Sequence, residues 1–447
     1  MNLDPKLIDK IYNAFDPFET LQPRDAAYVD CGEVRGDSNI VRELGKKIVR
    51  SNSATCHLYA GHRGVGKSTE LARLKDYLEQ NQCFVVYFSA DQEDIDSEDA
   101  KYTDILLACT RHLLQDLRDT NPDPILHWLK DCWEDLKALS LTELKLDRVN
   151  VDAAIATFGK ITASLRAVPS QRAKIRELID PHTTTLLQAL NEFIDEAKNQ
   201  LPLGKTKLVV IADSLDRIVP VIQEDGRTNH DRIFIDRSQQ LRSLDCHVVY
   251  TVPISLPFSS RANDLVENYG HVTILPMIMV HNLDPTRRAY PAGLAKIKEI
   301  IQARIDKIQP GIDLEKQIFE NSAVLEQICL MCGGHVRQLM QLIQEAINNI
   351  DQFPITQRAA QRSIAKLRDI YRRTIEEPQW QLLAEVAQTK ELANSDEYRE
   401  LLFNRCLLEY VYVDSSGNPK RWCDVHPLIR EIPKFQQVVQ QLNQANP

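Results

Sequence analysis

At 447 residues the chain is too long for one ordinary hydrophobic core, and its 43% of hydrophobic residues can fill two to four domains. No apolar run approaches the roughly 20 residues that span a bilayer, and the first residues lack the pattern of a secretory signal, so we expect a cytoplasmic protein without membrane contact. The net charge of −9 argues against a chain that mainly binds nucleic acid, because neutralising phosphates needs concentrated Lys and Arg.

An N-terminal segment, residues 1–49, leads into the first predicted element, a short apolar strand at 56–60. The glycine-rich loop that follows fits the pattern glycine, four residues, then Gly-Lys-Ser, and apolar residues at helical spacing come after it. In such a loop backbone N–H groups point at phosphates, Lys67 reaches the β- and γ-phosphates, and Ser68 binds Mg²⁺. The sequence therefore predicts a nucleotide-binding P-loop, made of Gly61, His62, Arg63, Gly64, Val65, Gly66, Lys67, Ser68 and Thr69.

Further β-rich apolar runs lie at 83–90, 207–213, 247–252 and 271–275, with helical segments between them. Alternating strands and helices predict an α/β fold with a parallel sheet, whose ligand lies at the carboxyl ends of the strands. We expect residues 50–283 to form this P-loop NTPase core.

Over a hundred mostly helical residues separate the second strand from the third, far more than one crossover helix requires. This insertion, about residues 100–200, has helical patterns at 103–117, 125–139, 149–165 and 180–197. Its sequence leaves open whether it contacts a partner or only packs against the sheet.

Beyond residue 284 the strand signal disappears and helical periodicity predominates, which predicts a helical lid domain at 284–352. In the last part, residues 353–447, helices are followed by two short strands around a turn at 414–418. Helices followed by a hairpin predict a C-terminal winged helix.

The strand at 207–213 ends at Asp213, which we expect to hold Mg²⁺ together with Ser68. Many P-loop ATPases follow this aspartate with a glutamate that orients the attacking water, but here the next residue is Ser214, a poor base. Asp216 is the candidate for that role, and a local ion pair with Arg217 is its alternative. Slow hydrolysis is therefore expected.

Three other residues are candidates for contact with the nucleotide. Thr251 lies at the tip of the fourth strand, where it either senses the γ-phosphate or caps the strand. Arg337 lies in the first turn of a lid helix, after a glycine pair, and can reach the γ-phosphate. Arg35 belongs to the N-terminal segment, which we expect to wrap the adenine.

These features together resemble the AAA+ and STAND branch of P-loop ATPases. The string 213–217, Asp-Ser-Leu-Asp-Arg, is similar to the Asp-Asp-Leu-Asp-Arg of the KAP ATPases, and Val425-His426-Pro427 is similar to the Met-His-Asp motif of STAND proteins, with proline in place of the aspartate. The resemblance implies ATP, ADP and Mg²⁺ as ligands, and it implies that His426 contacts the β-phosphate of ADP in a closed state.

The resemblance favours a slowly hydrolysing regulatory switch, in bacterial defence or signalling, that changes conformation or oligomeric state to control a partner. It implies a separate effector or sensor protein and a nucleotide-dependent homo-oligomer, for which Arg261, Arg287 and Arg288 are candidates to complete a neighbour's site. A nucleotide-bound scaffold without turnover is an alternative motivated by Ser214.

A second alternative is a DNA-associated AAA+ ATPase, of the initiator or transposition-regulator type, with the winged helix on DNA. Between Arg358 and Lys434 there are thirteen Lys and Arg against twelve Asp and Glu, and the compact basic points are 372–373 and 420–421. This near-neutral balance leads us to expect that nucleic acid is not the favoured partner.

Overall fold

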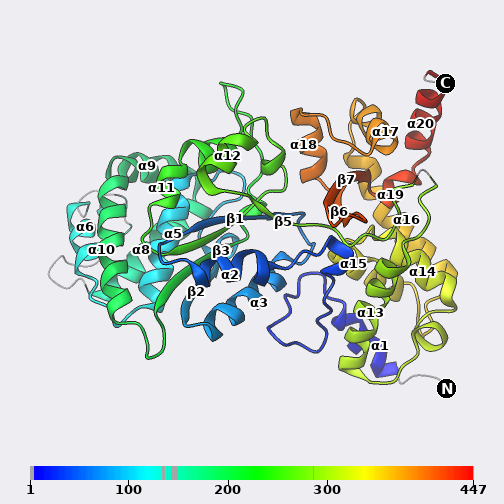
Figure 1. Cartoon of the computed structure of the whole chain (residues 1–447), viewed down its shortest axis with the longest axis horizontal. Coiled ribbons are helices and arrows are strands. Elements are labelled where there is room, and N and C mark those ends of the chain that lie inside the picture. The colour runs from blue at the N-terminus through cyan, green and yellow to red at the C-terminus, as the bar shows by residue number, and fades with distance from the viewer. Residues whose placement is uncertain are drawn as a thin grey trace. The chain divides into compact units, whose positions relative to one another are not determined.

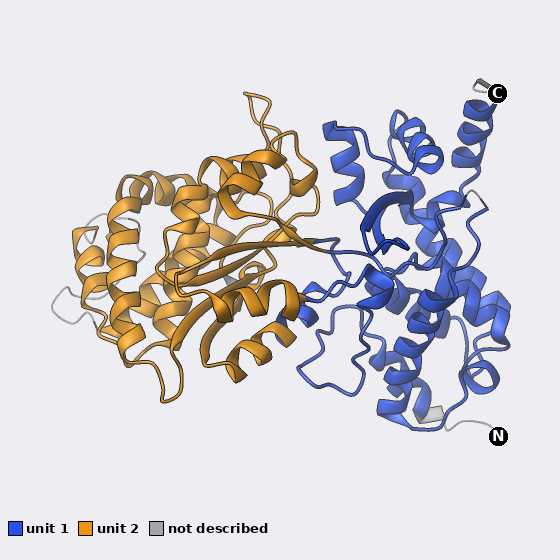
Figure 2. Ribbon diagram, in the orientation of Figure 1, with its two compact units in different colours: residues 1–39, 61–72, 275–447 blue, residues 40–60, 73–274 orange. Residues whose placement is uncertain are grey.

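The computed structural model describes residues 5–132, 136, 137, 139, 141, 150–284 and 286–445. The chain divides into two compact units, which Figure 2 colours separately. The first unit contains residues 1–39, 61–72 and 275–447, and the second contains 40–60 and 73–274. The P-loop thus belongs to the first unit and the strand before it to the second. The domain boundaries expected at 49, 283 and 352 stay predictions.

A five-stranded sheet forms the centre of the second unit (Figure 1). Its strands, in the order β2-β3-β4-β1-β5, are β1 Cys56–Gly61, β2 Cys83–Ser89, β3 Lys207–Asp213, β4 His247–Val252 and β5 Thr273–Leu275. The pairs β2–β3, β3–β4 and β4–β1 are parallel. The predicted α/β fold class with a parallel sheet is confirmed. Two strands are shorter than predicted: β2 ends at Ser89, one residue before the end of the range 83–90, and β5 begins at Thr273, two residues into the range 271–275.

The strands form because each is a nearly continuous apolar run, as expected for parallel strands covered on both faces. In β3 every residue after Lys207 is buried, and in β4 all six residues are buried. The parallel register places Ser89, the last residue of β2, opposite Asp213, the last residue of β3. Polar side chains at these strand ends therefore meet at one edge of the sheet.

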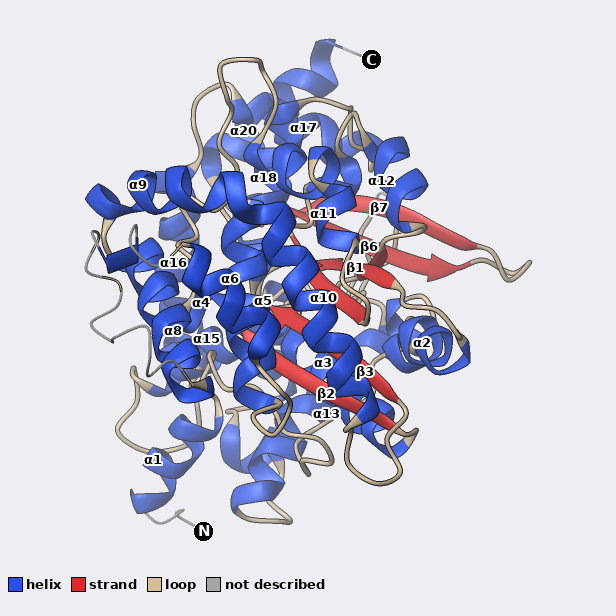
Figure 3. Cartoon of the chain, turned by 90° about the vertical axis from the view of Figure 1, so that its left-hand side faces the viewer, coloured by secondary structure: helices blue, strands red, loops and turns tan. Residues whose placement is uncertain are grey.

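The insertion after β2 is helical, as predicted, and Figure 3 shows its helices in front of the strands. Its helices are α4 Ala90–Glu93, α5 Tyr102–Asp116, α6 Asp123–Asp131, α8 Val151–Ala167, α9 Pro169–Ile179 and α10 Thr183–Asn199. They share one apolar core with the sheet, in which Phe158 and Phe193 are completely buried alongside Val210. Residues 133–135, 138 and 149 of the predicted helices lie outside the described residues.

The four helices named next complete the strand-to-helix alternation of the sheet. They are α2 Lys46–Arg50, α3 Lys67–Gln80, α11 Ser238–Arg242 and α12 Ala262–Tyr269. α3 begins at the P-loop lysine and continues into the second unit.

The first unit is mainly helical and contains one antiparallel hairpin. Its elements are α1 Pro5–Ala14, α13 Pro291–Ile308, α14 Ser322–Met331, α15 Val336–Ile347, α16 Gln357–Thr374, α17 Gln379–Thr389, α18 Asp396–Phe403, β6 Leu407–Val413, β7 Pro419–Val425, α19 Pro427–Arg430 and α20 Pro433–Ala445. The order of three helices and a hairpin agrees with the expected pattern, and the winged-helix interpretation stays a prediction. Among the described helices, none combines the length and apolarity needed to cross a membrane.

Candidate functional site

The P-loop connects β1 to α3 and turns through two glycines with positive φ. Gly64 has φ 87° and Gly66 has φ 110°, values that L-residues with a side chain rarely adopt. A Cβ at Gly64 would lie 2.7 Å from side-chain atoms of His335 and Arg337, whereas nothing lies within 4 Å of one at Gly66. The loop thus needs glycine at 64 for both its conformation and its neighbours.

Lys67 is folded back onto its own loop in this structure. Its Nζ donates to the carbonyl oxygens of Gly61, at 2.7 Å, and His62, at 3.0 Å, and the residue is only 5% exposed. A buried ammonium has to be neutralised or hydrogen-bonded, and phosphate oxygens are stronger partners than carbonyls. The loop and its lysine therefore fit a nucleotide phosphate, with Ser68 and Thr69 half-buried beside them.

The predicted lid helix α15 begins directly on the P-loop. The backbone N–H of Arg337 donates to the Gly64 carbonyl at 3.1 Å, and Nε2 of His335 contacts the Arg63 carbonyl at 2.6 Å. His335 also caps α15, because its Nδ1 accepts the Gln338 N–H at 2.9 Å. The Arg337 side chain donates from Nε to the Pro17 carbonyl at 3.0 Å, and its predicted γ-phosphate contact stays a prediction.

The N-terminal segment also contacts the P-loop. Arg35, 5% exposed at the end of a short 3₁₀ helix, donates from Nη2 to the Val65 carbonyl at 2.8 Å. The Tyr28 hydroxyl lies 3.2 Å from Oε1 of Glu70, one turn into α3. The segment therefore holds the P-loop backbone through a cation, and its expected contact with adenine stays a prediction.

His62 links the P-loop to the hairpin. Its Nε2 accepts the backbone N–H of Glu409, in β6, at 3.1 Å, so the two parts of the first unit share a buried hydrogen bond. Burial, with the nearby cations Lys67 and Arg405, lowers the pKa of His62 to about 3. The neutral ring that accepts this bond is thus the form present at neutral pH.

His426 is completely enclosed at the start of α19. Its Nδ1 accepts the Leu428 N–H at 3.2 Å, and its ring stacks on Tyr371 with centroids 4.9 Å apart. Burial, followed by the charge of Arg405, lowers the pKa of His426 to about 3. Among the described residues its Nε2 has no hydrogen-bond partner. The phosphate contact that the resemblance implies stays a prediction.

Asp213 lies buried in the second unit at the end of β3. Tyr87 donates its hydroxyl to Oδ2 of Asp213 at 2.7 Å, and the Ser214 N–H donates to Oδ1 at 2.6 Å. Burial, together with the Asp213 charge, raises the pKa of Tyr87, so its hydroxyl stays a donor. A carboxylate held in this way can bind a hard cation such as Mg²⁺, the role predicted for Asp213.

Thr251 connects β4 to the turn after β3. Its hydroxyl donates to the Ala212 carbonyl at 3.3 Å and accepts the Leu215 N–H at 2.9 Å. Asp216 lies in that turn, which is the 3₁₀ helix η5 Leu215–Arg217, and is 5% exposed. Thr251 therefore fixes the segment that carries Asp216, and the catalytic roles of both residues stay predictions.

The three arginines proposed to complete a neighbour's site are engaged in ion pairs. Arg261 binds Asp236 at 2.6 Å and Asp264 at 2.8 Å. Arg287 donates to Asp424 at 3.0 Å, and the exposed Arg288 lies 3.4 Å from Asp284. The role of an arginine in completing a neighbour's site stays a prediction.

Sequence reasoning did not assign roles to Tyr87, His335 or Glu409. His335 offered a local signal, since a hydrogen-bonding residue just before a helix is a capping position. The contact between His62 and Glu409 joins residues 347 positions apart, and the one between Tyr87 and Asp213 joins residues 126 apart. Such contacts depend on the tertiary fold and leave no local pattern.

No protein family and no curated protein matches the sequence. Among solved structures, the ORC1 protein of Aeropyrum pernix in complex with DNA is 11% identical, with 96% of each chain covered and a TM-score of 0.37. The ORC2 protein of Aeropyrum pernix, in ADPNP and ADP complexes, is 9% identical, covers 97% of this chain and 98% of its own, and has a TM-score of 0.41. The Walker-type ATPase PABY2304 of Pyrococcus abyssi is 12% identical, covers 96% and 99%, and has a TM-score of 0.39. Values this low assign no function to this chain.

The expectation that nucleic acid is not the favoured partner is corrected, and the ORC1 protein named above was solved in complex with DNA. The physical reason is that the charge balance between Arg358 and Lys434 is a sum over helices and strands of very different charge. Helix α16 alone contains six Lys and Arg against one acidic residue, Asp369. The acidic residues that restore neutrality lie elsewhere, three of them in α18.

Proposed function

We propose that this protein is a P-loop ATPase of the AAA+ type that acts in association with DNA. ATP binding is supported by the P-loop, where Lys67 exchanges two carbonyl partners for phosphate oxygens. Ser68, next to Lys67, would hold Mg²⁺, which neutralises charge on the phosphates when bound. The observation that carries the association with DNA is the basic face of α16.

The basic face consists of exposed cations spaced along one side of an 18-residue helix. Its members are Arg358, Arg362, Lys366 and Arg373. At about 1.5 Å per residue they form a row about 22 Å long. Such a row suits a DNA backbone, which carries a negative charge every ~3.4 Å of each strand.

The partners of these cations leave them able to bind phosphate. Lys366 pairs with Glu345 and Arg373 with Asp369, and both cations are more than half exposed. Exposed pairs of this kind contribute only about 0–1 kcal/mol, so phosphates can replace them. Arg358 and Arg362 form no ion pair with any residue that the structure describes.

The hairpin and α18 support a DNA contact less well. Arg421 lies 2.6 Å from Glu409, a buried carboxylate whose pKa is raised by burial against the effect of that arginine. Helix α18 contains three acidic residues and one arginine, Arg399, which pairs with Asp396. We therefore place the DNA contact on α16.

The test is the salt dependence of binding to a labelled DNA duplex, measured by fluorescence anisotropy. The slope of log K against log salt is negative, at roughly −0.9 per phosphate contact. Replacing Arg358, Arg362 and Lys366 by glutamine should therefore make this slope less steep by about 2.7. The matched control replaces Lys298, Lys316 and Lys434, three ion-paired surface lysines, by glutamine. Equal slopes for the two triple variants would refute the assignment to α16.

A nucleotide-dependent rearrangement is a second candidate, favoured by the contacts of the P-loop within the first unit. Its residues 62–64 bond to Glu409 in the hairpin and to His335 and Arg337 at the lid helix. A ligand shifts such an equilibrium only by its different affinity for the two states. Hydrogen exchange of α15 and β6 should therefore differ between ADP and a non-hydrolysable ATP analogue, and identical exchange would exclude the rearrangement.

A further inference from the structure

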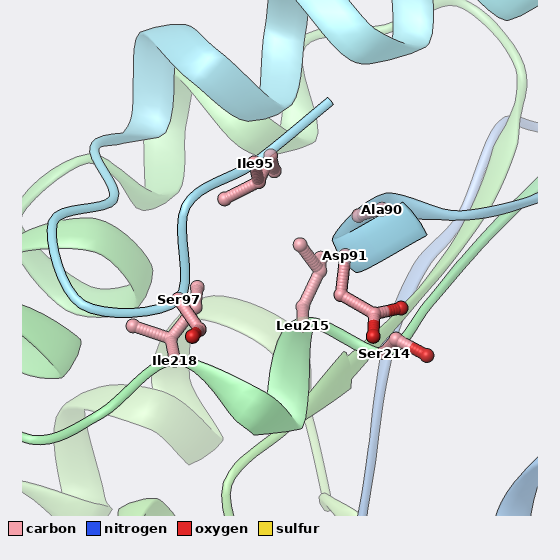
Figure 4. A pocket seen from close by; sticks show the side chains of 7 residues that line it. All are labelled: Ala90, Asp91, Ile95, Ser97, Ser214, Leu215 and Ile218. Carbon is pink, nitrogen blue, oxygen red and sulfur yellow. The ribbon is translucent and has the colours of Figure 1, made fainter. Parts of the chain in front are cut away.

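The first unit contains a cavity of about 360 Å³ whose wall is formed by α1, the segment 15–27 and α13. Helices α1 and α13 lie side by side in Figure 1. The volume is at the lower end of the range for small-molecule sites, about 300–1,000 Å³. The cavity in Figure 4, with Asp91 and Ser214 in its wall, has only about 10 Å³ for the centre of a water molecule and can hold one water. Of these two cavities, the first alone is large enough for an organic ligand.

Arg304 lies in the wall of the larger cavity and has hydrogen-bond donors to spare. It is 5% exposed, and its Nη1 donates to the Ala14 carbonyl at 2.7 Å and to Oε2 of Glu19 at 3.1 Å. Its Nε is buried and has no hydrogen-bond partner among the described residues. A guanidinium has five N–H donors in one plane and often binds a carboxylate through two of them. Because a buried donor without a partner is costly, this arginine favours a further acceptor in the cavity.

The charges around the cavity leave one positive charge in excess. The wall contains one carboxylate, that of Glu19, and three cations, which are Lys10, Arg304 and Lys307. Lys307 pairs with Asp25 at 2.9 Å and lies 4.0 Å from Glu19. Lys10 is exposed and forms no ion pair with any residue that the structure describes. With Asp25 included, three positive charges face two negative charges, so one further anion would neutralise the group.

We propose that this cavity binds a small organic monocarboxylate. One carboxylate neutralises the excess charge, whereas a phosphate monoester such as phosphoserine carries about −1.5 to −2 at pH 7 and would exceed it. The apolar side chains of Ala14, Ala27 and Ile308 also line the wall and suit an apolar body attached to the carboxylate. Lys10 and Arg304 bind the carboxylate, and Ile308 contacts the body.

The cavity shares no residue with the P-loop or with the basic face of α16. It is therefore a ligand site in addition to those for ATP and DNA, and its test does not depend on either activity.

The experiment measures the binding of three aromatic probes to the full chain by ligand-observed NMR titration. Benzoate carries one carboxylate on an apolar ring and should bind with a Kd of about 1–10 mM, as expected for a ligand of so few atoms. Benzamide has nearly the same shape without the charge and should bind at least about tenfold more weakly. Equal binding of benzoate and benzamide would overturn the proposal. Tighter binding of phenyl phosphate than of benzoate would overturn the assignment to a monocarboxylate.

Two substitutions test whether benzoate binds in this cavity. Lys10→Glu reverses an exposed charge in the wall and should weaken benzoate binding about three- to tenfold. Ile308→Trp fills the space and should abolish binding while the melting temperature stays at the wild-type value. The matched control is Lys296→Glu, about 12 Å along α13 from Arg304 and outside the wall, where salt screens the charge. It should leave the Kd for benzoate unchanged within about twofold. A wild-type Kd in both Lys10→Glu and Ile308→Trp would place benzoate elsewhere and refute the site.

Discussion

The buried histidines predict a specific loss of stability in acid, which is clearest for His426. Its pKa is about 3 in the folded protein, against 6.5 for an ordinary histidine. Below about pH 6.5 the unfolded state binds a proton at this histidine, whereas the folded state stays unprotonated. The contribution of His426 to the free energy of unfolding is therefore fully present above that pH and is lost as the pH falls. At about pH 5 the difference amounts to about 2 kcal/mol for this one residue, at 1.36 kcal/mol per pH unit.

The substitution His426→Asn removes this titration and keeps the acceptor for the Leu428 N–H, because asparagine is a good N-cap. Between about pH 7 and pH 5 the variant should therefore lose about 2 kcal/mol less unfolding free energy than the wild type. The cations and rings facing the site, Arg405, His62 and Arg287, remain in both proteins. The comparison thus isolates one group.

The assay combines urea unfolding at both pH values with NMR titration of ¹³C-labelled histidine. The resonance that disappears in His426→Asn identifies the residue. We expect its chemical shift to stay at the value of a neutral imidazole while the protein remains folded. Titration of the native resonance near pH 6.5, or equal acid sensitivity of the two proteins, would refute the burial argument.

Three further substitutions test other parts of the two units. Gly64→Ala should weaken ATP binding about tenfold or more, because a left-handed backbone costs ~1–2 kcal/mol in alanine and because the new Cβ would lie 2.7 Å from Arg337. The control is Gly417→Ala, where φ is similar and the space around the new Cβ is open. This control should leave the Kd for ATP, measured by calorimetry, unchanged. Asp424→Asn should lower the unfolding free energy, measured in urea, by about 3–5 kcal/mol. It leaves three cations without their shared buried carboxylate, namely Arg287, Lys390 and Arg430. Asp369 is only partly buried, so Asp369→Asn should cost under about 1 kcal/mol. Thr251→Val should lower stability by about 1–3 kcal/mol by leaving the Leu215 N–H unpaired, and Thr251→Ser should not, so equal melting temperatures for the two would contradict the contact.

The parts of the fold that could be predicted are those with a local cause. The glycines and Lys67 of the P-loop act within nine residues, and β3 is visible because its apolar run is buried on both faces. The strand order could not be read in this way, since β4 lies between β1 and β3 although it follows both in the chain. The pairing of Ser89 with Ser214 depends on that order, because it joins the ends of adjacent strands that are 125 residues apart.

The net charge of the chain led to a wrong expectation about nucleic acid, because salt screens charges that lie far apart on the surface. At physiological salt, exposed charges more than about 8 Å apart hardly influence one another. The net charge of −9 therefore has little effect on a phosphate lying along α16, where Arg358 and Arg362 follow each other at about 6 Å. Removing the one acidic residue of that helix, by Asp369→Asn, should release Arg372 and Arg373 and raise affinity for DNA, although the whole chain stays acidic. An unchanged affinity would mean that these two arginines do not reach the phosphates.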